Sequence, residues 1–91
     1  MRYAIAVTAR ARKDILALPV EDARRITKKL RFFISSSNPL RHAKPLSNTE
    51  IAEYRFRVGD YRILFDMGPR GNITLLTILT VKHRKNVYRG L

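Results

Sequence analysis

Residues 54–66, YRFRVGDYRILFD, decide the fold because they read as two β-strands joined at Gly59 and Asp60. A Gly-Asp pair between two alternating apolar runs is typical of a two-residue hairpin, since glycine supplies the positive φ that type I′ and II′ turns require. The two loop residues also fix the register of the predicted hairpin. It pairs Val58 with Tyr61, Arg57 with Arg62, Phe56 with Ile63, Arg55 with Leu64 and Tyr54 with Phe65.

Side chains alternate along a strand, so the two faces of this hairpin differ in chemistry. Directly opposed like charges destabilise a β-ladder by roughly 0.2–1 kcal/mol per pair, and a bound anion would relieve that repulsion. Arginine suits bidentate phosphate contacts, so we expect the cationic face to be functional; a merely solvated cationic face is the alternative. That face carries Arg55, Arg57 and Arg62, whereas Tyr54, Phe56, Val58, Tyr61, Ile63 and Phe65 share the apolar face.

The composition indicates one small domain with a polyanionic partner. Ninety-one residues, taken as a single domain over 1–91, leave no room for a second one, and 19 Lys and Arg against 7 Asp and Glu give a net charge of +12. Nucleic acid is the first candidate for the partner, an acidic protein the second and an anionic membrane surface the third. Charge alone does not choose among them.

Other partners and locations are disfavoured by what the sequence contains. It has no cysteine and two histidines, so we expect neither a disulfide framework nor a zinc site, and no cofactor. The longest apolar stretch, residues 73–81, is too short for a membrane-spanning helix. The N-terminus has no uninterrupted apolar segment of the kind found in a signal peptide, so we expect a cytoplasmic protein.

Along the chain, periodicity predicts the order β-α-α-β-β-β with a basic tail, an α+β fold with a two-helix hairpin on one face of a small, mostly antiparallel sheet. Residues 3–7 alternate as a strand, and Thr8 is a candidate N-cap for a helix that Pro19 ends. Residues 35–49 hold two prolines and predict a crossing loop. Residues 73–81 predict a central strand with Ile73, Leu75, Leu79 and Val81 on one face and Leu76 and Ile78 on the other.

The second helix is amphipathic. We expect its apolar stripe to comprise Val20, Ala23, Ile26, Leu30, Phe33 and Ile34, with Leu16 beside the stripe of the first helix. Its other side is basic, which fits either a solvated face or a surface that tracks phosphates. The residues assigned to RNA binding on this side are Arg24, Arg25, Lys28 and Lys29.

Three motifs together resemble the RelE/ParE superfamily of toxin–antitoxin systems, and specifically its RelE-like mRNA interferase branch. They are the loop NPLRHAKPL at residues 38–46, the segment YRFRVGDYR at residues 54–62 and the ending VKHRKNVYR at residues 81–89. The resemblance covers almost the whole chain. It implies an endoribonuclease that cleaves mRNA in the ribosomal A site without a metal, and an acidic, RelB-like antitoxin that suppresses it.

The resemblance also implies roles for individual residues. Arg55 and Arg57 match the paired basic residues of the family's second strand, and Arg62 matches its phosphate-stabilising arginine. Where well-studied members carry a lysine as general base this chain has Arg57, and arginine is a poor proton acceptor. The residues that the tail contributes are Arg84 and Tyr88 as the family's basic and aromatic pair, His83 as a candidate for proton transfer, and Lys82 and Lys85 as RNA contacts.

Two other functions are compatible with the same sequence. The ParE-like branch shares the fold and acts on DNA gyrase. A module that binds RNA without cleaving it would use the same basic face.

Overall fold

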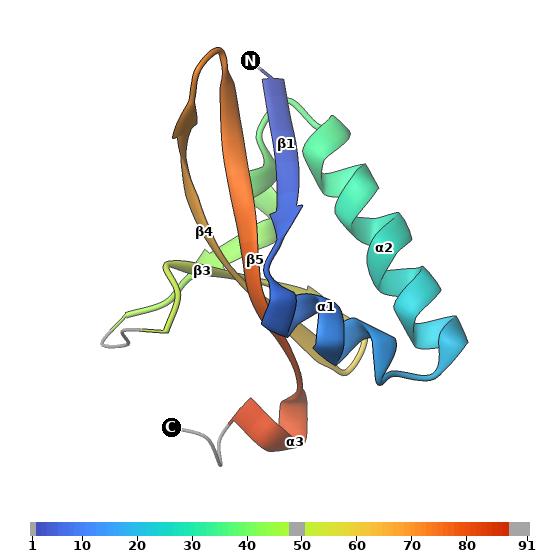
Figure 1. The fold of residues 1–91 in the computed structure, drawn as a ribbon. Helices are drawn as coiled ribbons and strands as arrows, with labels where there is room; N and C mark the ends of the chain where they lie inside the picture. Colours follow the sequence, from blue (N-terminus) through green and yellow to red (C-terminus); the bar gives the residue numbers. More distant parts are fainter. Residues whose placement is uncertain (1, 48–50, 88–91) are drawn as a thin grey trace.

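The computed structural model describes residues 2–47 and 51–87, which form a five-stranded sheet with two helices against it (Figure 1). The strand order is β1-β5-β4-β3-β2, with β1 parallel to β5 and the other pairs antiparallel. The predicted α+β class and the central position of the last strand are confirmed. The elements are β1 (Arg2–Val7), α1 (Ala9–Leu16), α2 (Val20–Ser35), a 3₁₀ helix η1 (Pro39–His42), β2 (Ala43–Pro45), β3 (Tyr54–Val58), β4 (Tyr61–Arg70), β5 (Ile73–His83) and α3 (Arg84–Val87).

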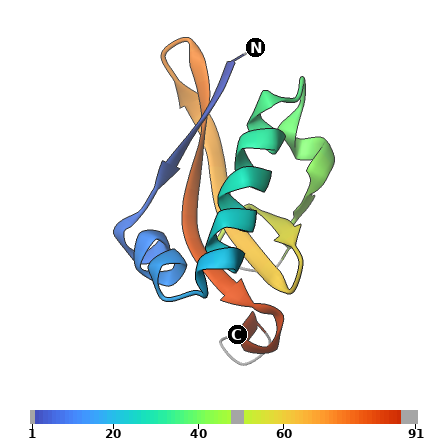
Figure 2. The same ribbon diagram turned by 90° about the vertical axis from the view of Figure 1, so that its right-hand side faces the viewer.

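Helix α2 covers one face of the sheet and supplies most of the helical side of the core (Figure 2). Its buried residues are Ile26, Leu30 and Phe33. The Phe33 ring stacks on Phe56 at 4.4 Å between centroids, and Phe56 stacks on Phe65 at 4.3 Å. The face of the sheet that lies opposite α2 is called the open face below.

The hairpin of β3 and β4 has the predicted register at all five pairs, from Val58 with Tyr61 to Tyr54 with Phe65. Gly59 has a φ of 59°, in the left-handed region that favours glycine. Because the turn holds two residues, the register had no freedom to slip, and the apolar and cationic faces lie as expected.

Two parts of the sheet differ from the prediction. Ala43–Pro45, expected in a loop, forms the short edge strand β2 that pairs with β3, because proline is tolerated where no further strand needs its missing N–H. Strand β5 continues two residues past the expected end at Val81, to His83. Lys82 and His83 therefore belong to the sheet rather than to a tail.

An irregularity in the β4–β5 pairing overturns the predicted faces of β5. Leu64 pairs with Thr80 but Phe65 pairs with Ile78, so Leu79 is an extra residue in β5. Such a bulge breaks the two-residue alternation. Val81, opposite Ile63, and Ile78, opposite Phe65, consequently lie on the same, helix-facing side, where both are buried.

The junction of the two helices also differs from the expected stripe. Helix α1 ends at Leu16, and Pro19 stands at the N-cap of α2. Leu16 is 75% exposed and Val20, predicted to be in the core, is 65% exposed. The two side chains remain in solvent because they lie at the turn, beyond the part of the helices that contacts the sheet.

Helix α1 covers the edge of β5 beyond the end of β1. Thr8 caps the helix as predicted, since its Oγ1 accepts from the Ala11 N–H at 3.1 Å. The Thr8 N–H donates to the Ile78 carbonyl, and its hydroxyl donates to the Leu79 carbonyl. In the described part of the chain, no helix has the length and apolar character needed to cross a membrane.

Candidate nucleic-acid interface

Three cations stand opposite one another across three strands of the open face. Arg57 on β3 pairs with Arg62 on β4, which pairs with Lys82 on β5. We call these three residues the cationic row. Arg57 is exposed, whereas Arg62 and Lys82 are half-buried and the Nε atom of Arg62 is shielded from solvent. Arg55, two residues before Arg57 on β3, extends the positive charge along the same face.

The cationic row concentrates like charge in the part of a sheet where neighbouring side chains are closest. Cross-strand partners have Cβ atoms about 4.5–5.5 Å apart. Three guanidinium and ammonium groups held in this way repel one another and provide many N–H donors on one side of the sheet. The arrangement suits a phosphate group, whose charge offsets the repulsion and whose oxygens accept from several donors.

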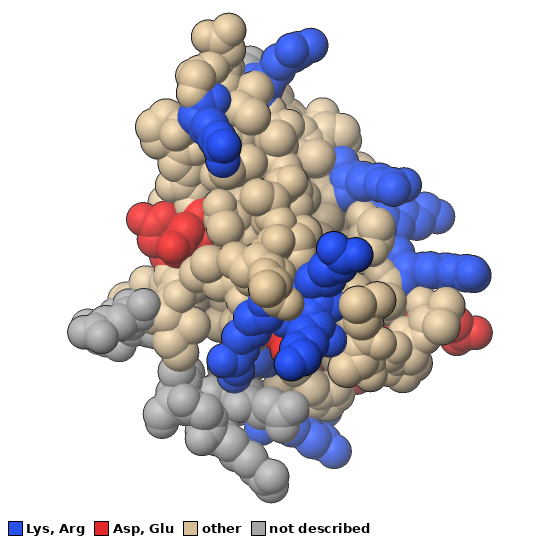
Figure 3. Space-filling view, in the orientation of Figure 1, with Lys and Arg blue, Asp and Glu red and all other residues tan. Residues whose placement is uncertain are grey.

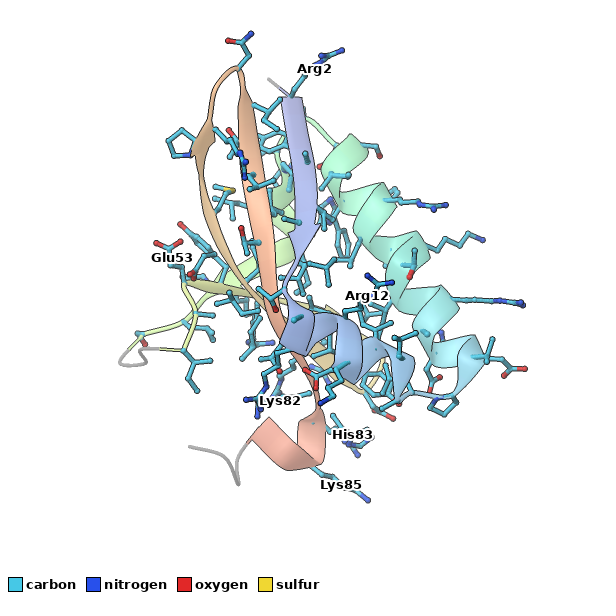
Figure 4. The ribbon with its side chains drawn as sticks, viewed as in Figure 1. Arg2, Arg12, Glu53, Lys82, His83 and Lys85 are labelled. Carbon is cyan, nitrogen blue, oxygen red and sulfur yellow. The ribbon has the colours of Figure 1, made fainter. Side chains whose placement is uncertain are left out.

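His83 does not join the cationic row, contrary to its predicted place in the site. It pairs with Tyr61, and its ring meets the Tyr61 ring edge-on at 5.4 Å between centroids. In Figure 4 the side chains of Lys82 and His83 leave β5 toward opposite sides. The physical reason is strand alternation, because Lys82 and His83 are consecutive residues in the regular part of β5 beyond the bulge and therefore face opposite sides.

Tyr61 ties the hairpin to α2 on this helix-facing side. Its hydroxyl donates to the Asp22 carboxylate at 2.8 Å. That hydrogen bond, followed by burial and the negative charges of Asp22 and Asp60, raises the pKa of Tyr61 above its ordinary value of 10.0. The contact fixes the hairpin end against the helix, and thereby fixes the strands that carry Arg57 and Arg62.

Arg84 lies at the hairpin turn. Its backbone N–H donates to the backbone carbonyl of Asp60 at 2.7 Å, and its side-chain Nε lies 3.8 Å from an oxygen of the Asp60 carboxylate. Both side chains are more than half exposed, so this ion pair contributes at most about 1 kcal/mol. Lys85 is exposed one residue later, in α3, and Tyr88 lies outside the described residues.

The basic residues of α2 do not lie on the open face. Arg24, Arg25, Lys28 and Lys29 project from a helix that covers the other side of the sheet (Figures 1 and 2). Arg25 comes close to the hairpin turn, where its Nη1 would be 3.2 Å from a Cβ placed on Gly59. The structure therefore places these four residues on the opposite side of the sheet from Arg55 and Lys82, which were also predicted to bind RNA.

The acidic residues beside the open face are occupied by backbone hydrogen bonds. Asp66 accepts from the Glu53 N–H at 2.9 Å, and Glu53 accepts from the Met67 N–H at 3.0 Å. Residues 2–47 and 51–87 contain no cluster of three His, Cys, Asp or Glu side chains placed to hold a metal ion.

A family model described as the ParE toxin of the type II toxin–antitoxin system parDE matches residues 5–88. The chain belongs to the RelE/ParE superfamily of type II toxins. Toxin RelG of Mycobacterium tuberculosis is 33% identical over 89 residues, which cover 98% of this chain and 99% of that protein. The resemblance stated from the sequence is thereby confirmed at the level of the superfamily.

Two solved structures share the fold of this RelE/ParE toxin. The toxin–antitoxin complex RelBE2 of M. tuberculosis matches with a TM-score of 0.63 and 29% identity, covering 92% of this chain and 100% of that one. The RelB–RelE antitoxin–toxin complex of Methanococcus jannaschii matches with a TM-score of 0.62 and 23% identity, covering 93% and 96%. The second match supports the fold alone.

Sequence reasoning singled out Lys82 as an RNA contact but missed its place in the cationic row. The predicted strand ended at Val81, which left Lys82 in the tail. The bulge at Leu79 also changes which residues of β5 face the open side, and the sequence pattern did not reveal it. It also did not select Arg10, Arg12 and Lys13, the exposed cations of α1. The signal that could have found them is the presence of three cations within the eight residues of this helix.

Proposed function

We propose that this toxin is a ribosome-dependent endoribonuclease that cleaves mRNA in the A site and so inhibits translation. The observation that carries the proposal is the cationic row, which offers donors for a phosphate on a face that neither α1 nor α2 covers. The 33% identity to toxin RelG and the family match support the toxin class. A toxin that cleaves mRNA in the ribosome would act in the cytoplasm.

The reaction is attack of an RNA 2′-hydroxyl on the adjacent phosphate. The new bond joins the 2′-oxygen to phosphorus as the 2′-hydroxyl proton passes to a base. The bond to the 5′-oxygen breaks and that oxygen takes a proton from solvent, so the products carry a 2′,3′-cyclic phosphate and a free 5′-hydroxyl. Arg57 and Arg62 would stabilise the negative charge that accumulates on the phosphorane-like transition state. One such preorganised donor contributes roughly 3–4 kcal/mol.

Lys82 is the residue of the cationic row that we assign to proton transfer. Arginine keeps its proton in proteins, whereas lysine can act as a base. Arg57 therefore stabilises charge, and Lys82, once its ammonium has given its own proton to solvent, would accept the proton of the 2′-hydroxyl. His83, which faces α2, is too poorly placed for this step and leaves the proposed catalytic set.

The remaining roles follow from position. Arg55 and Lys85 would contact flanking phosphates, and Arg84 would stabilise charge from the hairpin turn. Tyr88 would stack on a base, a contact worth about 1–3 kcal/mol.

The partner that we propose is an acidic antitoxin of the RelB type. The solved relative that is 29% identical to this chain is a toxin–antitoxin complex. A groove between α1 and α2 fits an amphipathic acidic helix, because its apolar floor is flanked by cations that would pair with carboxylates. Its lining includes Ile15, Leu16, Leu18, Val20 and Ala23, with Arg24, Lys28 and Arg31 beside them.

The proposed activity is tested on ribosomes programmed with a defined mRNA. Wild-type toxin should cut inside codons only when ribosomes are present, leaving 2′,3′-cyclic phosphate ends. Arg57→Gln should slow single-turnover cleavage by about 10²–10³-fold. Arg70→Gln, a change of the same charge at the far end of β4, is the matched control and should cut at the wild-type rate.

The main rival is inhibition of DNA gyrase, which the ParE description of the family model favours. The same preparation would be added to a supercoiling assay. Intact transcripts on ribosomes together with loss of supercoiling would overturn the endoribonuclease in favour of the gyrase inhibitor. Salt-dependent binding to ribosomes without cleavage would instead assign a non-catalytic RNA-binding role.

A further inference from the structure

Helix α1 presents a strongly cationic side that the proposed reaction does not use. Its packed side carries Ala11, which is fully buried, and Ile15, which packs against the core. The exposed side carries Arg10, Arg12 and Lys13, which line a shallow, open depression. Figure 3 shows Lys and Arg side chains gathered over α1, in the lower centre of the view.

The acidic residue of this helix does not neutralise those cations. The Asp14 Oδ2 atom accepts from the Thr80 hydroxyl at 2.6 Å and from the Val81 N–H at 3.0 Å. Its carboxylate therefore faces β5. Within residues 2–47 and 51–87, none of the three α1 cations is paired with a carboxylate, whereas Arg84 is paired with Asp60.

The same two hydrogen bonds place α1 beside the cationic row. Thr80 and Val81 directly precede Lys82, and Asp14 holds the helix against that segment of β5. In Figure 4 Lys82 extends from β5 just below the start of α1. An extended polyanion leaving the open face at Lys82 would meet the cations of α1 next.

We propose that Arg10, Arg12 and Lys13 form a second phosphate-binding surface, which holds RNA backbone that continues from the cationic row around the edge of β5. The proposal rests on the proposed function, since it extends the same RNA path. This surface makes no base-specific contact and takes no part in bond cleavage. It increases affinity for RNA through phosphate neutralisation.

RNA backbone fits this surface better than an acidic protein does. A protein partner needs apolar area to bury, and the large apolar residue of this depression is Leu16, at its border with the α1–α2 groove. The other lining residues are the three cations, Ala9 and Asp14. Long, exposed cations around Ala9 can follow the phosphates of a flexible RNA chain without needing apolar area to bury.

The test compares Arg10→Gln/Lys13→Gln with Arg2→Gln/Arg70→Gln. Both pairs remove two positive charges from exposed positions. Arg2 and Arg70 both register with Ile73, at the end of the sheet far from α1. Binding of a short single-stranded 2′-O-methyl RNA, which lacks the attacking hydroxyl, would be measured over a range of salt concentrations, with thermal melts to confirm folding.

We expect the slope of log K against log salt to become less steep by about 1.4 for the α1 pair, or 0.7 for each phosphate that the protein no longer neutralises, and by less than half of that for the control pair. Equal changes in the two pairs would mean that net charge alone acts and would overturn the proposal. An unchanged slope in the α1 pair, with weakened binding of poly-L-glutamate, would overturn it in favour of an acidic protein.

The binding assay contains no ribosome and no cleavable bond, so it separates this inference from the proposed function. Failure of wild-type toxin to cut mRNA on ribosomes would sink the endoribonuclease. Equal salt slopes for the α1 pair and the control pair, together with wild-type toxin that cuts mRNA on ribosomes, would refute only the proposed α1 surface.

Discussion

At the scale of single residues, the cationic row contains two kinds of side chain. Two arginines keep their proton, whereas the lysine can lose its own. Arg57 and Arg62 are suited to charge stabilisation, and Lys82 stands directly opposite Arg62. His83 is separated from them by the thickness of the sheet. The division of labour that we propose within the row therefore depends on which type of cation occupies which strand.

Replacing Lys82 tests that division. We expect Lys82→Arg and Lys82→Ala to slow single-turnover cleavage at neutral pH to a similar extent, by about 10²–10⁴-fold, because arginine keeps the charge but cannot accept the proton. Binding of the uncleavable 2′-O-methyl RNA should survive Lys82→Arg and weaken in Lys82→Ala. Near-wild-type cleavage by Lys82→Arg would show that the residue contributes charge alone.

Tyr61 gives a prediction about stability and pH. Its pKa is raised by the hydrogen bond to Asp22, so the folded state favours the protonated phenol. The stabilisation is fully present below the ordinary value of 10.0 and is lost as the pH rises through the higher pKa of the folded protein. Tyr61→Phe should lower the free energy of unfolding by about 1 kcal/mol at pH 7.

Urea unfolding of both proteins at pH 7 and at increasing alkaline pH checks this expectation. The difference between wild type and Tyr61→Phe should shrink as the pH exceeds the phenol pKa. A difference that stays constant across the alkaline range would assign the effect to packing against His83 rather than to the Asp22 hydrogen bond.

At the scale of elements, α1 covers the part of the β5 edge that β1 does not reach. β1 ends opposite Ile78, and from there Thr8 and Asp14 satisfy backbone groups on the free edge of β5. Unpaired N–H groups on a sheet edge invite association with other chains. The helix that carries the cations thus also closes the edge.

Asp14→Ala should therefore destabilise the fold. The change leaves the Val81 N–H and the buried Thr80 hydroxyl without their acceptor, which costs about 1–3 kcal/mol. Asp14→Asn keeps one acceptor oxygen and should recover part of the loss. Lys13→Ala, an exposed neighbour, should shift the melting temperature little, and a melt of Asp14→Ala that matches Lys13→Ala would refute this role.

Elements whose geometry is set locally could be predicted from the sequence. Gly59 and Asp60 fixed the hairpin register because a two-residue turn leaves no alternative, and that register put Arg57 opposite Arg62. The bulge at Leu79 is set by long-range fitting of β5 to β4 and to α1, so alternation failed there, and the place of Lys82 in the candidate site was lost with it. The edge strand Ala43–Pro45 was missed for a similar reason, since only pairing with β3 makes it a strand.

At the scale of the whole molecule, the net charge of +12 is distributed over surfaces that differ in apolar content. The cationic row and the exposed side of α1 present charge, whereas the α1–α2 groove combines cations with exposed Leu16 and Val20. A +12 domain should associate rapidly with any polyanion, and association should slow as salt increases. The apolar residues can then distinguish an acidic protein from RNA.

Leu16→Ser/Val20→Ser tests whether the groove holds the antitoxin. Both residues are mostly exposed, so the free energy of unfolding should change by no more than about 0.5 kcal/mol each. Affinity for the proposed acidic antitoxin, to be sought in the neighbouring open reading frame, should fall tenfold or more, equivalent to about 1.4 kcal/mol, because the antitoxin helix loses its apolar contacts. Phe32→Ser, an exposed apolar residue of α2 outside the groove lining, is the control. Titration calorimetry at low and high salt would show a loss that persists at high salt, since apolar burial is not screened. An equal loss in Phe32→Ser, or an affinity unchanged by the double substitution, would place the antitoxin on another surface of the toxin.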